Sequence, residues 1–144
     1  MKYFLLLIFS ISSFANDHSM STDFSDCKGK VVNYYVSKII PGGSVEGMMK
    51  ASKMHQEFYD KQGANIKVYP ALQYLRNEDG TNEKLHRVST MVVWDSVSAW
   101  SEWRESINAL SEEDRAKADK EYNAFVAKYN KNTEVVAQRR WCML

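Results

Sequence analysis

The chain has 144 residues, of which 44% are hydrophobic and 26% are charged, and its 19 basic side chains nearly balance its 18 acidic ones. This length and composition predict one globular domain, and the small net charge supplies no excess of Lys or Arg for binding nucleic acid or an acidic membrane surface. Aromatic residues make up 12% of the chain, which provides material for a core and excludes a disordered or low-complexity protein.

Residues 1–15 carry the pattern of a signal peptide. Lys2 precedes an apolar run over residues 3–9, and the small residues Ser13 and Ala15 occupy the positions that signal peptidase recognises. We expect cleavage after Ala15 and an exported protein, either periplasmic or secreted. The apolar run is shorter than the roughly 20 residues that span a bilayer, and no second run follows it, so we expect no membrane partner.

Residues 16–30 are expected to form a mobile tail, because residues 16–26 are polar and show no periodicity. Cleavage after Ala15 would make His18 the third residue of the mature chain, where backbone nitrogens and the imidazole can hold Cu(II) or Ni(II) in a square plane. A chance histidine in a solvated tail is the simpler interpretation. We therefore predict no metal site and no cofactor in the remaining domain, residues 31–144.

The domain is predicted to begin with a strand over residues 31–40, which are rich in β-branched and aromatic types and are followed by Pro41-Gly42-Gly43. Ser44 can cap a helix that runs to about residue 62, with Gly63 as its C-terminal stop. Helical spacing places a mostly apolar set on one side of this helix, namely Met48, Ala51, His55, Phe58 and Tyr59. We expect this side to face a sheet.

Two antiparallel strands are predicted next, over residues 66–75 and 86–94, joined through a turn at 77–80. Pro70 favours an edge position for the first of them, because proline cannot donate to a neighbouring strand. Asp95 or Ser96 then caps a second helix, and Ser111 caps a third. The apolar stripes of these helices are Trp100, Trp103, Ile107 and Leu110 in one, and Ala118, Tyr122, Phe125, Val126 and Tyr129 in the other.

A fourth strand over residues 133–141 completes the order strand, helix, strand, strand, helices, strand. This order predicts an α+β protein of the ferredoxin-like, split βαβ type, with helices on one face of a four-stranded antiparallel sheet. The first strand has apolar residues on both faces, so the face away from the helices would stay an exposed apolar patch unless a second sheet covered it. We therefore expect a sheet-to-sheet homodimer.

Cys27 and Cys142 are the two cysteines of the chain. In the predicted sheet the fourth strand runs antiparallel to the first, which brings the residue before the first strand close to the residue after the fourth. An exported protein meets oxidising conditions, so this topology predicts a disulfide between the two. Two free thiols, or a bond between chains, remain the alternative.

The chain resembles the dimeric α/β-barrel superfamily over residues 31–141, including domains of the antibiotic-biosynthesis monooxygenase type. The resemblance is carried by Ile39-Ile40-Pro41-Gly42 at the end of the first strand, by the amphipathic helix ending near Gly63, and by residues 94–100 between third strand and helix. It implies two sheets paired in a barrel and a ligand held between sheet and helices. Haem-degrading members carry a histidine on the helix after the third strand, whereas this chain has no histidine after His86 and has Arg104 there.

His55 is the candidate catalytic residue, since it lies on the apolar side of its helix, where a titratable group would face any cavity above the sheet. Tyr35 is a second candidate for handling protons. A core histidine that hydrogen-bonds a tyrosine is the alternative interpretation of His55. The expected ligand pocket combines a few polar groups with aromatic walls: Asn33, Tyr35, Ser37, His55, Trp94 and Trp103.

Two functions are open at this point. The favoured one is a dimeric domain that binds a small molecule between sheet and helices, with no claim about catalysis. The alternative is a cofactor-independent, monooxygenase-like enzyme in which the substrate itself activates oxygen. Neither requires nucleic acid or a membrane, and a pocket filled by the aromatic side chains would favour a protein without catalysis.

Overall fold

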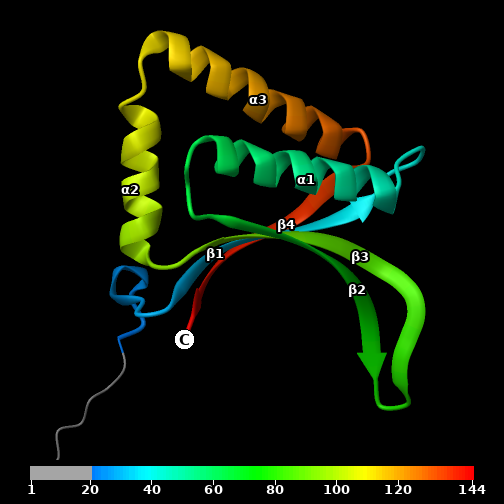
Figure 1. Ribbon diagram of the computed structural model, residues 1–144. Coiled ribbons are helices and arrows are strands. Elements are labelled where there is room, and N and C mark those ends of the chain that lie inside the picture. Colours follow the sequence, from blue (N-terminus) through cyan, green and yellow to red (C-terminus); the bar gives the residue numbers. More distant parts are fainter. Residues whose placement is uncertain (1–20) are drawn as a thin grey trace, which may run out of the picture.

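The computed structural model describes residues 21–144 and contains one sheet with helices packed on it (Figure 1). The predicted signal peptide, its cleavage point and His18 lie outside these residues. The elements, in chain order, are a short 3-10 helix at Phe24–Asp26, β1 at Lys30–Ile39, α1 at Val45–Lys61, β2 at Lys67–Asn77, β3 at Gly80–Trp94, α2 at Val97–Asn108, α3 at Glu112–Asn130 and β4 at Thr133–Met143.

The sheet has the strand order β2-β3-β1-β4, and every neighbouring pair is antiparallel. This is the strand order expected when a split βαβ unit closes with its fourth strand beside the first. The predicted α+β, ferredoxin-like fold class is therefore confirmed. β2 is an edge strand, as predicted from Pro70. Proline has no N–H group to donate, and an edge strand has a neighbour on one side only, so it tolerates this loss.

The helices cover one face of the sheet. Figure 1 shows α1 and α3 side by side above it, while α2 stands at the end where β1 begins. Each helix begins where predicted, because a serine side chain accepts a hydrogen bond from a first-turn backbone N–H: Ser44 for α1, Ser96 for α2 and Ser111 for α3. The predicted apolar side of α1 is buried along its whole length.

The hairpin of β2 and β3 is longer than the sequence predicts. β3 was expected from residue 86, yet it begins at Gly80 and pairs with β2 as far as Asn77. Residues 81–87 are mostly polar and exposed, so no hydrophobic alternation marks them as a strand. Their backbone pairing with β2 holds them extended, and Figure 1 shows this hairpin curving away beyond the helices.

Residues 16–30 are expected to form a mobile tail, yet Phe24 and Cys27 within this segment contact the rest of the domain. Cys27 forms a disulfide with Cys142, which confirms the predicted pairing, and the two Cα atoms lie 5.7 Å apart. Cys142 pairs with Val31 in the β1–β4 ladder, so the two ends meet as the topology requires. Phe24 packs edge to face on Trp100 with ring centres 5.9 Å apart. The overall polarity of the segment does not predict this single aromatic contact.

The two faces of the sheet carry different side chains. Ladder partners show that the face under the helices contains Val31, Tyr35, Val92 and Trp94, whereas the opposite face, called here the outer face, contains Val32, Tyr34, Val36, Tyr69, Met91, Val93 and Trp141. On the outer face, the Tyr34 and Trp141 rings pack with centres 4.3 Å apart. Over residues 21–144, no helix is both long and apolar enough to cross a membrane.

Candidate functional site

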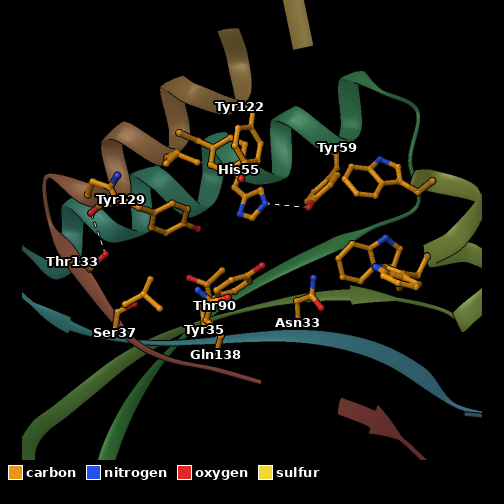
Figure 2. A pocket seen from close by; sticks show the side chains of 17 residues that line it. Asn33, Tyr35, Ser37, His55, Tyr59, Thr90, Tyr122, Tyr129, Thr133 and Gln138 are labelled. Atoms are coloured by element: carbon orange, nitrogen blue, oxygen red, sulfur yellow. Dashed lines mark hydrogen bonds between the residues drawn. The ribbon is translucent and has the colours of Figure 1, made fainter. Parts of the chain in front are cut away.

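A cavity of about 390 Å³ lies between the sheet and the helices. β1, β3 and β4 form its floor, and α1, α2 and α3 form its roof and one end (Figure 2). The residues predicted for the ligand pocket all line this cavity: Asn33, Tyr35, Ser37, His55, Trp94 and Trp103. Strand alternation explains why Asn33, Tyr35 and Ser37 share the floor, since residues two apart point to the same face of a sheet.

Other lining residues were missed by the prediction. Some were identified as apolar stripe residues without being assigned to a pocket, namely Tyr59, Trp100, Tyr122, Phe125, Val126 and Tyr129. Thr90 shares the face of Trp94 and could have been found by alternation along β3. Gln138 and Val135 could not, because the β1–β4 pairing shifts between Val36 and Ser37, and the bulge moves the register of β4.

His55 projects from α1 into the space above the sheet (Figure 2). Its ring stacks on Phe125 with centres 4.1 Å apart, and its Nε2 lies 3.3 Å from the Tyr59 hydroxyl. The residue is 7% exposed, and burial lowers the pKa of His55 to about 4. The imidazole is therefore neutral at neutral pH.

Three tyrosines of the cavity, Tyr35, Tyr59 and Tyr129, are held protonated for a related reason. Burial raises the pKa of Tyr59, Tyr129 and Tyr35, since a phenolate would lose its hydration there. The Tyr129 hydroxyl donates to Ser52 Oγ at 2.9 Å, which ties α3 to α1. Among residues 21–144, no Asp, Glu, Lys or Arg lines this cavity, so the described lining is electrically neutral at neutral pH.

Polar atoms beside the cavity lack partners within residues 21–144. These atoms are His55 Nδ1, Trp94 Nε1 and Trp103 Nε1, each buried and without a hydrogen bond. A buried polar group without a partner destabilises a fold by about 1–3 kcal/mol. A small shift of these side chains toward a molecule in the cavity would give them partners. The unpartnered polar atoms of His55, Trp94 and Trp103 thus all belong to side chains that line the cavity.

Metal-binding side chains do not gather at this cavity. Within residues 21–144, no group of three or more His, Cys, Asp or Glu residues is positioned to hold a metal ion. His55 is accompanied by tyrosine and aromatic carbon rather than by carboxylates. The lining residues therefore offer hydrogen bonds and aromatic surfaces to a ligand.

Comparison of the chain with protein-family models, with curated proteins and with solved structures found no match.

Proposed function

We propose that this protein is an exported, dimeric α/β-barrel domain that binds a small molecule with a flat apolar body between its sheet and its helices. The observation that carries this proposal is the cavity of about 390 Å³, which is within the size range of small-molecule sites. Aromatic rings wall it, and the few polar groups sit at defined points. A filled aromatic core would leave no such volume.

The chemistry of the lining favours binding over catalysis. A general base works best when its pKa lies near the operating pH, and the pKa of His55, at about 4, is well below it. The neutral imidazole and the protonated Tyr35 hydroxyl are suited to hydrogen-bonding a carbonyl or hydroxyl group of a ligand.

The alternative is a cofactor-independent monooxygenase-like enzyme. It is favoured by the position of His55, whose Nδ1 lacks a partner and whose ring borders the same cavity as Tyr35. In that reaction His55 would take a proton from an acidic C–H or O–H group of the substrate, and the resulting anion would react with dioxygen. The proton would have to come from a group acidic enough to overcome the lowered pKa of His55.

The proposed dimer uses the outer face of the sheet. Several apolar or aromatic side chains there are solvent-exposed in the single chain, among them Tyr69 at 52% and Trp141 at 40%. Met91 pairs with Tyr69 on one side and on the other side with Tyr34, whose ring packs on Trp141. A second copy of the same face would cover this patch by packing sheet on sheet.

The proposal of export is supported by the Cys27–Cys142 disulfide, because such bonds persist in oxidising compartments. The signal-peptide pattern of residues 1–15 points the same way.

Native mass spectrometry tests the binding function. The protein would be sprayed with and without N-phenyl-1-naphthylamine, an uncharged aromatic probe. We expect a dimer that takes up one probe molecule per chain. Purified protein that retains a cellular molecule would show an added mass, equal to the mass of that molecule, before the probe is added. Protein that takes up no probe at saturating concentration would contradict the proposed binding site.

A further inference from the structure

Arginine side chains lie beside the cavity, where α2 packs near β1 and β4. A second hollow of about 240 Å³ is lined by Asn33, Tyr35, Gln138, Arg139 and Arg140. Asn33, Tyr35 and Gln138 also line the main cavity, so the two hollows adjoin. A molecule lying in the main cavity can therefore extend one end toward Arg140.

Arg140 is held in a defined orientation. Its Nε donates to Asn33 Oδ1 at 2.9 Å, and its guanidinium carbon lies 4.6 Å from the centre of the Trp100 ring and 5.6 Å from that of Phe24. Cation–π contacts and one hydrogen bond thus fix the guanidinium plane. The terminal nitrogens of Arg140 make no hydrogen bond to residues 21–144, which leaves that edge of the fork for an acceptor from outside.

A second guanidinium accompanies it. Arg104 of α2 lies 4.9 Å from the centre of the same Trp100 ring. In the described part of the chain, no carboxylate forms an ion pair with Arg104 or Arg140. Positive charges gathered without a counter-charge repel each other, and an anion placed beside them relieves that repulsion. The two arginines come from different elements, Arg104 from α2 and Arg140 from β4. Figure 1 shows that α2 and the end of β4 approach the same corner of the molecule.

The contrast between the two hollows indicates the ligand class. We propose that the ligand is an amphipathic organic anion, with a flat apolar body in the neutral cavity and a carboxylate or sulfonate-like group on Arg140, assisted by Arg104. This inference rests on the proposed binding function and adds the charge and orientation of the ligand. The arginine fork suits a planar anionic group because it can donate two parallel hydrogen bonds.

A matched pair of fluorescent probes tests the proposal. 8-Anilinonaphthalene-1-sulfonate and N-phenyl-1-naphthylamine share one aromatic skeleton, and only the first carries a sulfonate. By fluorescence titration, we expect the wild type to bind the sulfonate at least about tenfold more tightly, in keeping with a charge-assisted hydrogen bond. Added salt should weaken the binding of the sulfonate and leave the uncharged probe nearly unaffected.

Variants assign the effect to the two arginines. Arg140→Gln should remove most of the preference for the sulfonate, and Arg104→Gln should reduce it, while both retain the wild-type affinity for the uncharged probe. Arg76→Gln is the control, because it makes the same change of charge near the β2–β3 turn, which lies at the other end of the sheet from this corner (Figure 1). We expect it to behave as the wild type.

The outcomes separate the two proposals. If both probes bind equally well to the wild type, or if Arg140→Gln and Arg76→Gln have equal effects, the anion site is wrong and the binding cavity stands. If neither probe binds, the binding function itself is contradicted, and the anion site with it.

Discussion

At the scale of a single residue, the burial of His55 makes the stability of the fold depend on pH. Its pKa is lowered from 6.5 to about 4 by burial, so the unfolded chain binds a proton more tightly than the folded one. Stability from the neutral imidazole is therefore fully present above the unfolded pKa and is lost as the pH falls from 6.5 toward about 4.

We predict that this loss reaches about 3 kcal/mol, the free energy that corresponds to the shift of the His55 pKa. Urea unfolding of the wild type and of His55→Phe, measured across this pH interval, checks it. The phenyl ring keeps the stacking on Phe125 but does not titrate, so the variant should lose less stability on acidification. Parallel pH profiles for the two proteins would show that His55 is not the responsible group.

Gly47 is required by a close approach between α1 and the segment before β4. A Cβ atom at Gly47 would overlap Asn132 Oδ1, which accepts a hydrogen bond from the Ser44 backbone N–H. Alanine normally favours a helix over glycine by about 1 kcal/mol. Here Asn132 would have to move and release its hydrogen bonds, including the one it donates to the Lys128 carbonyl.

We therefore predict that Gly47→Ala destabilises the protein by about 1–3 kcal/mol, the usual range for overpacking a buried site. In an Asn132→Ala background the same substitution should be neutral or stabilising, because the blocking side-chain atoms are gone. Chemical denaturation of the two single variants and the double variant measures this coupling. Additive effects would contradict the proposed contact.

The serine caps show which structural elements could be predicted from sequence. Ser44, Ser96 and Ser111 act through hydrogen bonds to residues only three positions away, so local sequence is enough to place the starts of the helices. The arms of the β2–β3 hairpin are different, because their exposed residues 81–87 are held by pairing alone and carry no hydrophobic period. Their length depends on the partner strand and could not be predicted.

The candidate site divides in the same way. Alternation and helical periodicity placed Asn33, Tyr35 and His55 on facing surfaces, which is why they meet at the cavity. Whether the rings of Trp94 and Trp103 fill the space or only wall it depends on packing between distant elements, which periodicity does not encode. The sequence does not predict that Arg104 and Arg140 lie close together, because they come from α2 and β4, and no local pattern connects these two elements.

The Cys27–Cys142 disulfide connects the segment before β1 to the last strand, β4. It closes a loop with a sequence separation of 115 residues, and loop-closure entropy predicts a stabilisation of about 4–5 kcal/mol for a loop of that length. We predict a loss of this order, measured by guanidinium denaturation, for the double variant Cys27→Ser/Cys142→Ser. Reduction of the wild type should have a similar effect, and equal stability of oxidised and reduced protein would contradict this role.

In the proposed dimer, the outer face of the sheet is the surface through which two copies associate. If two copies pair through it, a charge at its centre is buried without a partner on association, which opposes pairing strongly. We predict that Met91→Lys is a monomer in light scattering coupled to gel filtration, while the wild type is a dimer. Ala124→Lys, an exposed position on α3, is the control and should remain dimeric. A monomeric wild type, or a dimeric Met91→Lys variant, would contradict the proposed sheet-to-sheet dimer.

The central claim is that the space between sheet and helices is a binding site, and blocking that space tests it most directly. Thr90 is 7% exposed and lines the cavity, so a tryptophan there should occupy part of its volume. Thr81→Trp makes the same substitution at the exposed end of the β2–β3 hairpin and leaves the cavity open. A second blocking variant, Val126→Trp on α3, guards against a local failure of folding, which circular dichroism detects.

The decisive measurement is the affinity of N-phenyl-1-naphthylamine for these folded proteins. We predict that Thr90→Trp and Val126→Trp bind the probe at least about tenfold more weakly than the wild type, a difference of about 1.4 kcal/mol, whereas Thr81→Trp binds it equally well. Undiminished binding by both folded blocking variants would contradict the claim, because the probe would then be held somewhere other than between the sheet and the helices.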